Sequence, residues 1–150
     1  MKTFSTPMGE LRVEVFGHAS VRFTINGKTI YVDPYGEVHN YKGDTPADLI
    51  LVTHNHYDHY DPKAYKEIET PLTTYVVSQN VGHVDGRYTV LANDQVCTWD
   101  GIEIAAVEAY NVNRRNPQGD LFHPRGVGNG YVLDFEGFKV YLSLDRKSVV

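Results

Sequence analysis

The stretch Ile50-Leu51-Val52-Thr53-His54-Asn55-His56-Tyr57-Asp58-His59 carries the strongest structural signal in this 150-residue sequence. Its first three residues form an apolar run typical of a short strand buried on both faces. Because side chains alternate along an extended backbone, His54 and His56 are expected to point the same way and bind one ion. Asp58 and His59 lie further on and can bind a second ion. Imidazole and carboxylate groups are good ligands for zinc or iron, so the stretch predicts a metal site.

The residues after this cluster predict a short helix. Asp61 is a favourable N-cap, Pro62 suits the first helical position, residues 63–68 continue the helix, and Pro71 closes the segment. A second, shorter helical turn around residues 79–84 has only weak support.

The rest of the chain mostly alternates apolar and polar residues with period two, which predicts a β-rich protein. Asn26-Gly27, Asp100-Gly101 and Glu136-Gly137 favour two-residue hairpin turns, and therefore antiparallel sheet. The segment 110–130 has no periodic pattern and predicts a long irregular loop, which is either functional or a surface insertion. No repeat or linker divides the chain, so residues 1–150 are expected to form one domain. The predicted strands are residues 10–16, 20–25, 28–32, 48–53, 73–77, 89–91, 96–99, 102–109, 130–135 and 138–142.

The composition excludes several classes of protein. Hydrophobic residues make up 41% and charged residues 22%, as in a globular domain. No apolar run approaches the roughly 20 residues of a membrane span, and no apolar stretch indicates a signal peptide, so a cytoplasmic location is expected. The net charge of -5 and the lack of a Lys/Arg cluster argue against nucleic acid as a partner. Cys97 is the only cysteine, which excludes an intrachain disulfide, and its expected role is that of a small buried residue.

The pattern His54-x-His56-x-Asp58-His59 resembles the H-x-H-x-D-H signature of the metallo-β-lactamase superfamily of binuclear metal-dependent hydrolases. Residues 15–20 and 30–34 resemble the opening hairpins of that fold, and residues 109–111, 122–126 and 130–132 are similar to an ascorbate-phosphate lactonase-like branch. The resemblance runs from about residue 10 to about residue 145. It implies an α+β fold, a four-layer αββα sandwich of mostly antiparallel or mixed sheets, with the metals at one edge between the sheets.

Carried over residue by residue, the resemblance implies a set of metal ligands. His54 and His56 would bind the first ion, Asp58 and His59 the second, and Asp145 would bridge the two. Asp58 would also be the catalytic residue, because it can hold, or accept a proton from, the metal-activated water.

The first ion requires one more ligand, for which Asn111 and His123 compete. The imidazole of His123 is the better zinc ligand, although Asn111 occupies the more usual place in the sequence. The Gly-Asp-Thr motif expected around the bridging aspartate is altered here, because Ser143 and Leu144 precede Asp145 and Arg146 follows it.

Other polar residues have two readings each. Asp33 either orients a ligand imidazole or forms an Asp-Pro turn. Arg114, Arg115 and Arg125 either meet an anionic group of the substrate or are solvated loop charges. No residue is assigned to substrate binding, and His18, His39 and His83 are not included among the predicted metal ligands.

Members of the superfamily continue past the Gly-Asp-Thr motif with further strands, helices and a last histidine ligand. The resemblance therefore implies a fold that is incomplete at the C-terminus. The expected function is that of a metal-dependent hydrolase, with zinc, manganese or iron, that attacks an ester, lactone, phosphoester or amide. The alternative is a truncated, catalytically impaired metal-binding remnant that acts as a binding module or has no activity. The expected partners are a small-molecule substrate and a second copy, paired through uncovered sheet surface, without nucleic acid or membrane.

Overall fold

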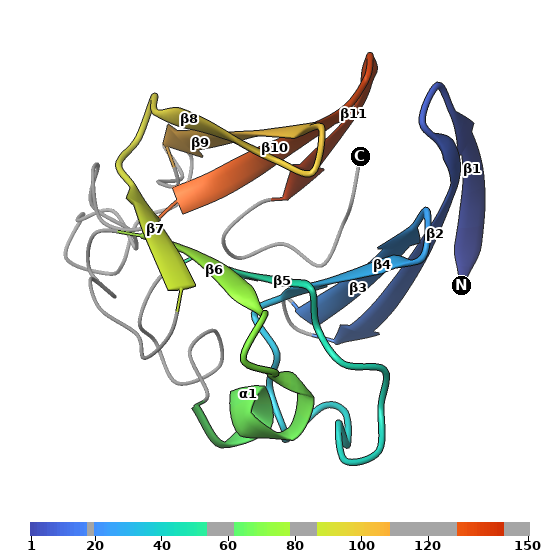
Figure 1. Cartoon of the computed structure of the whole chain (residues 1–150), viewed down its shortest axis with the longest axis vertical. Coiled ribbons are helices and arrows are strands. Elements are labelled where there is room, and N and C mark those ends of the chain that lie inside the picture. Colours follow the sequence, from blue (N-terminus) through green and yellow to red (C-terminus); the bar gives the residue numbers. More distant parts are fainter. Residues whose placement is uncertain (18–19, 54–61, 79–86, 109–128, 143–150) are drawn as a thin grey trace, which may run out of the picture.

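The computed structural model in Figure 1 contains two β-sheets that face each other and one short helix outside them. The structure describes residues 1–17, 20–53, 62–78, 87–108 and 129–142. Seven strands form the larger sheet: β1 (Lys2–Thr6), β2 (Gly9–Gly17), β3 (Ser20–Ile25), β4 (Lys28–Val32), β5 (Leu49–Val52), β6 (Thr74–Ser78) and β7 (Arg87–Leu91). The smaller sheet contains β8 (Val96–Trp99), β9 (Ile102–Glu108), β10 (Asn129–Phe135) and β11 (Phe138–Leu142), and the helix is α1 (Pro62–Ile68).

The larger sheet has the order β1-β2-β3-β4-β5-β6-β7, and its pairing changes at β4. The strands from β1 to β4 pair antiparallel, whereas those from β4 to β7 pair parallel. The smaller sheet, in the order β11-β10-β9-β8, is antiparallel throughout. The expectation of mixed sheets is confirmed. Because β4 and β5 run parallel, their carboxyl ends meet at one edge of the sheet, which brings Asp33 beside Thr53.

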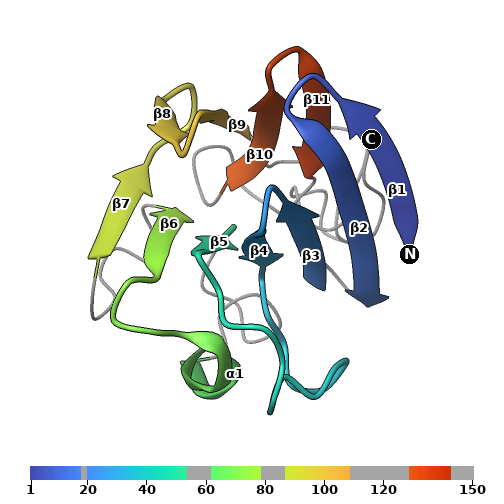
Figure 2. The same ribbon diagram turned by 45° about the vertical axis from the view of Figure 1, so that its right-hand side comes forward.

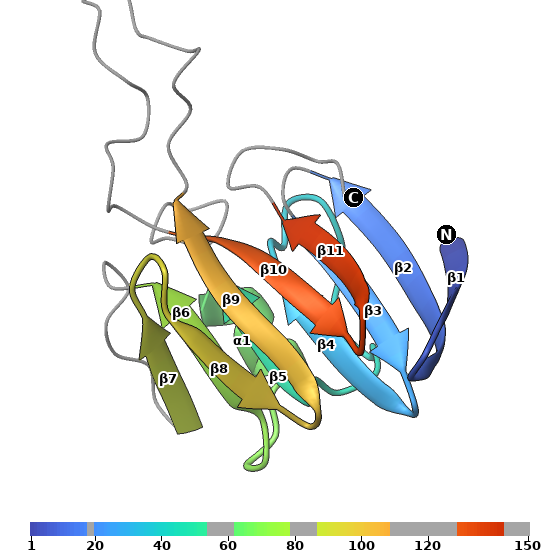
Figure 3. The same ribbon diagram turned by 90° about the horizontal axis from the view of Figure 1, so that it is seen from above.

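The main core lies between the two sheets, which overlap when seen from above (Figure 3). Alternate residues of the strands point into it, including Phe23 of β3 and Phe135 of β10, whose rings lie 6.4 Å apart. A second cluster lies on the opposite face of the larger sheet, where α1 packs with Ala64, Tyr65 and Ile68 buried. Figure 2 shows α1 on the side of the larger sheet that is away from the smaller sheet.

Strand β5 contributes to both clusters, which explains its continuous apolar run. Leu49 and Leu51 face the smaller sheet, while Ile50 and Val52 face the α1 side, and all four are completely buried. The prediction of a strand buried on both faces before the histidine cluster is therefore confirmed.

The three predicted hairpin turns are also confirmed. Positive φ angles occur at both turn residues in each case: 51° and 75° at Asn26-Gly27, 49° and 81° at Asp100-Gly101, and 55° and 109° at Glu136-Gly137. These angles match the twist of paired strands, so the turns set the register of the hairpins.

The main difference from the predicted elements is β1, which the sequence pattern did not indicate. Its residues Lys-Thr-Phe-Ser-Thr contain one apolar side chain, Phe4, whose ring lies 5.5 Å from that of Phe138. Helix α1 ends at Ile68 as expected. The N-cap Asp61, the weak helical turn at 79–84 and most of the predicted loop 110–130 lie outside the described residues.

The sandwich prediction is met in part. Two facing sheets and one outer helix are present, and the described residues are mainly strand. Within the described part of the chain, no helix covers the outer face of the smaller sheet, and no helix is long and apolar enough to cross a membrane.

Candidate functional site

The six predicted metal ligands lie outside the described residues. They are His54, His56, Asp58, His59, His123 and Asp145. The same holds for the alternative ligand Asn111, for the loop arginines Arg114, Arg115 and Arg125, and for His18 and His83. Among the residues that the structure does describe, no three His, Cys, Asp or Glu side chains are close enough together to hold an ion. The ligand set and the catalytic role of Asp58 stay predictions.

The structure does describe the segment that leads directly into the cluster, and Asp33 holds it. The backbone N–H of Thr53 donates to Oδ1 of Asp33 at 2.9 Å, and the Thr53 hydroxyl donates to Oδ2 at 2.8 Å. The Asp33 N–H in turn donates to the carbonyl of Leu51 at 2.9 Å, and Ser20 Oγ donates to the Asp33 carbonyl at 2.5 Å. Both Asp33 and Thr53 are almost completely buried. The carboxylate therefore fixes the residue immediately before His54.

Of the two readings of Asp33, the structure supports a role beyond a turn. The residue does adopt a left-handed φ of 43° before Pro34. Its carboxylate, however, points across to β5 and holds the end of that strand. Orientation of a ligand imidazole by Asp33 stays a prediction.

The smaller sheet reaches the same segment through Tyr131. The Tyr131 hydroxyl donates to the carbonyl of Val52 at 2.7 Å, and both residues are completely buried. Sequence reasoning missed Tyr131, Thr53 and Ser20 as supports of the site. One signal was present for Tyr131, because a tyrosine at an inward position of an apolar strand needs a buried partner for its hydroxyl.

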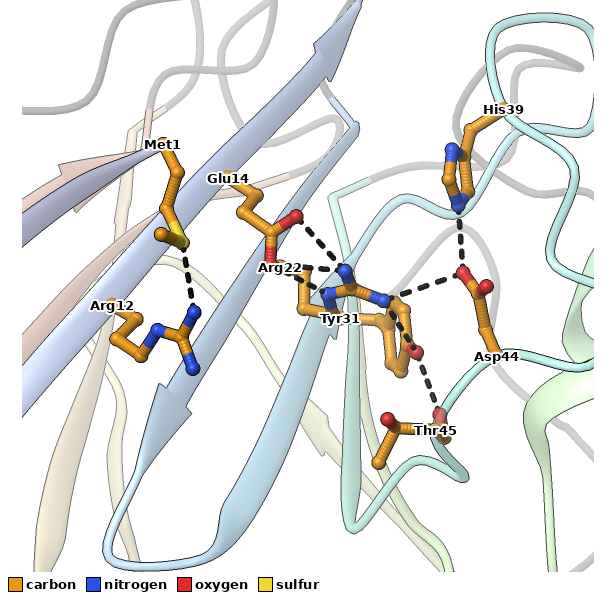
Figure 4. A network of polar contacts seen from close by, with 8 residues as sticks. All are labelled: Met1, Arg12, Glu14, Arg22, Tyr31, His39, Asp44 and Thr45. Atoms are coloured by element: carbon orange, nitrogen blue, oxygen red, sulfur yellow. Dashed lines mark hydrogen bonds and ion pairs between the residues drawn. The ribbon is translucent and has the colours of Figure 1, made fainter.

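A second polar network lies on the outer face of the larger sheet and is centred on Arg22 (Figure 4). Its Nη2 donates to both carboxylate oxygens of Glu14 at 2.9 Å, and its Nη1 approaches Asp44 Oδ2 at 3.3 Å. The guanidinium also lies over the rings of Phe16 and Tyr31, at 5.2 and 5.9 Å. Burial opposes the charge, but hydrogen bonds with Tyr31 and Glu14 outweigh it and raise the Arg22 pKa. The network ties the β4–β5 connection to β2 and β3.

His39, for which the sequence offered no partner, belongs to this network. Its Nε2 lies 2.6 Å from Asp44 Oδ2, and its ring stacks on Phe16 at 3.8 Å. The neighbouring Tyr41 is 1% exposed, and burial raises its pKa to about 12 although Ser20 and the Tyr35 backbone act in the opposite direction. These contacts between charged and aromatic groups hold the β4–β5 connection against the larger sheet.

Cys97 packs against the main core, but it is only half-buried, so the expectation of a small buried residue is met in part. Burial raises the pKa of its thiol, which keeps the thiol protonated and poorly nucleophilic. The structure therefore gives Cys97 a packing role.

Comparisons with known proteins agree with this architecture. A family model described as "Beta-lactamase superfamily domain" matches residues 12–143. The chain belongs to the β-lactamase superfamily. This membership confirms the resemblance drawn from the histidine cluster and from the hairpins that precede it.

Several bacterial proteins are similar to this chain in sequence or in fold. A UPF0173 metal-dependent hydrolase of Polynucleobacter asymbioticus is 33% identical, over 89% of this chain and 55% of the relative. A solved structure of a candidate metal-dependent hydrolase from Parabacteroides distasonis is 36% identical, with a TM-score of 0.83 over 96% of this chain and 65% of that chain. The metallo-β-lactamase fold protein YhfI of Bacillus subtilis shares the fold, with a TM-score of 0.61 at 13% identity over 87% of this chain and 61% of that one. The chain thus spans little more than half the length of the first relative.

Proposed function

We propose that this chain carries the metal centre of a hydrolase in which a metal-activated water attacks an ester, lactone, phosphoester or amide. The observation that carries the proposal is the position of the cluster. His54-x-His56-x-Asp58-His59 begins directly after Thr53, which Asp33 holds through both its backbone and its hydroxyl. Two relatives with over 30% identity bear the name of metal-dependent hydrolase, one of them as a candidate, which supports the same reaction class.

The donor chemistry of the cluster fits zinc. Imidazole nitrogen and carboxylate oxygen are both zinc ligands, and three histidines and one aspartate stand within six positions. In this proposal His54, His56 and His123 would hold one ion, Asp58 and His59 would hold a second, and Asp145 would be a shared ligand. Bound zinc would supply a Lewis acid and lower the pKa of a bound water to about 7.

The chain's own residues have distinct parts in this scheme. Asp58 orients the attacking water or accepts its proton, because a carboxylate beside the water can do either. Asp33 keeps Thr53, and so the start of the ligand segment, in place. The proposal also includes a small-molecule substrate, a cytoplasmic location and pairing with a second copy of the chain.

Removal of one imidazole tests the metal centre directly. His56→Ala leaves the first site one ligand short, so we expect it to lose most of the zinc that the wild-type chain retains after dialysis, as measured by elemental analysis. His83→Ala is the matched control and should keep the wild-type zinc content. Full zinc retention in His56→Ala would contradict the assignment.

The reaction is tested separately with Asp58→Asn and a panel of chromogenic lactone, phosphodiester, thioester and amide substrates. We expect zinc-dependent turnover of at least one class by the wild-type chain and a loss of roughly 100-fold or more in the variant, in the range of general acid–base catalysis. Zinc binding without turnover of any of these substrate classes would instead favour the alternative of a metal-binding module. None of the described residues supports that alternative.

A further inference from the structure

We infer that Tyr131 is a positioning residue for the proposed metal centre and acts through the peptide bond between Val52 and Thr53. The inference rests on the proposed function, because it assigns a role relative to the ligand segment that begins at His54. It adds a residue from the smaller sheet to a site whose other described supports belong to the larger sheet or adjoin it: Ser20 begins β3, and Asp33 directly follows β4.

The contacts hold one peptide plane at both ends. The carbonyl of Val52 accepts from the Tyr131 hydroxyl at 2.7 Å, and the N–H of Thr53 in the same peptide unit donates to Asp33 Oδ1 at 2.9 Å. The peptide is trans, so its C=O and N–H groups point in opposite directions. Two buried partners on opposite sides, together with the pairing of Val52 with Val77 of β6, therefore oppose rotation of the plane. That rotation would change the direction in which the chain leaves Thr53 toward the predicted ligand segment.

The Tyr131 side of this contact is itself firmly held. Tyr131 lies in β10, the second strand of its sheet, and is paired with Ala106 of β9 on one side and Leu142 of β11 on the other. The preceding Gly130 is closely surrounded, since a Cβ there would lie 3.0 Å from the Leu142 carbonyl. The position of the Tyr131 hydroxyl is thus set by a strand that is paired on both sides.

Loss of the hydroxyl should loosen the segment without dismantling the fold. In Tyr131→Phe the ring still fills the core, while the buried Val52 carbonyl loses this donor. The Asp33 bonds to Thr53 and the pairing of Val52 with Val77 of β6 remain, so the peptide loses one of its supports and not all of them. Replacement of residues that hold metal ligands in place through hydrogen bonds typically lowers metal affinity by about 10–100-fold.

The test compares zinc affinity in the wild-type chain, Tyr131→Phe and the matched control Tyr31→Phe. Tyr31 is also completely buried, and its hydroxyl donates to the carbonyl of Thr45 at 2.6 Å, but on the α1 side of the larger sheet. Zinc titration is expected to show an affinity about 10-fold or more lower for Tyr131→Phe, within the range for such supporting residues, and unchanged for Tyr31→Phe. In the metal-free state, hydrogen exchange of the Thr53 amide should be faster in Tyr131→Phe alone.

Each outcome bears on a specific claim. Equal zinc affinity in the wild type and Tyr131→Phe would overturn the positioning role. An equal loss of zinc affinity in Tyr31→Phe would also overturn the positioning role, because zinc affinity would then depend on the overall stability of the fold. A Tyr131→Phe chain without a cooperative melt would show that the hydroxyl is needed for folding itself, against the inference. A wild-type chain that binds no zinc would instead contradict the proposed function.

Discussion

Asp33 combines a backbone conformation that side chains rarely adopt with several hydrogen bonds that hold it there. A left-handed φ at a non-glycine residue costs on the order of 1 kcal/mol. Here the residue donates to Leu51 and accepts from Ser20 and Thr53. The strained turn directs the Asp33 carboxylate at Thr53, the residue before the predicted ligand segment.

Tyr41 provides a prediction for pH dependence. Burial raises its pKa to about 12 from the ordinary 10.0, so the folded state favours the neutral phenol. The contribution of this group to stability is fully present below pH 10 and is lost as the pH rises from 10 to about 12. Urea unfolding across that range should show a falling free energy of unfolding for the wild type and a shallower fall for Tyr41→Phe.

The matched control for this measurement is Tyr88→Phe, because Tyr88 is exposed on β7. Its pH profile should follow that of the wild type. Identical profiles for the wild type and Tyr41→Phe would show that Tyr41 is not the group responsible.

At the scale of elements, the Arg22 network joins β2, β3 and the β4–β5 connection. Arg22→Gln removes the charge between Glu14 and Asp44 and leaves the two carboxylates close together without it. We expect a loss of about 1–3 kcal/mol in the free energy of unfolding, as for hydrogen bonds to charged groups.

Arg12→Gln is the matched control for Arg22→Gln. Arg12 is exposed, and the hydrogen bond described for its guanidinium runs to the sulfur of Met1 (Figure 4). Its replacement should change the free energy of unfolding by less than about 0.5 kcal/mol, as at most surface positions. Similar losses for both variants in chemical denaturation would show that the network adds nothing specific.

Element prediction from the sequence succeeded where local patterns carry the information. β3, β4, β8 and β11 have the predicted bounds, because local sequence patterns indicate these strands and a predicted hairpin turn adjoins one end of each. β1 was missed since its single apolar residue gains its partner, Phe138, only in the folded chain. The supports of the candidate site have the same property. The contact between Tyr131 and Val52 spans 79 positions, and no local pattern encodes it.

At the scale of the whole molecule, the two sheets share one core and should unfold together. Phe135 is completely buried and faces Phe23 of the other sheet. Phe135→Ala should lower the free energy of unfolding by about 3–5 kcal/mol and keep a single thermal transition. Val90→Ala, at an exposed position, is the control and should have little effect. If calorimetry of either variant showed two separate thermal transitions, the two sheets would be independent folding units.

Pairing with a second copy through sheet surface stays a prediction at this scale. Val96 of β8 and Tyr141 of β11 are exposed hydrophobic residues of the smaller sheet, at 54% and 39%.

The contact between Tyr131 and Val52 also constrains the order in which the chain folds. The hairpins of β2–β3, β3–β4, β8–β9 and β10–β11 close short loops and can form early, whereas a contact across 79 positions bears a larger entropic cost of closure. The peptide at Val52, which is paired with Val77 inside the larger sheet, therefore gains its Tyr131 contact only after the two sheets have met. An ion held by the proposed site would bind the chain after the two sheets have met, and by mass action it would enrich the chains that have completed folding.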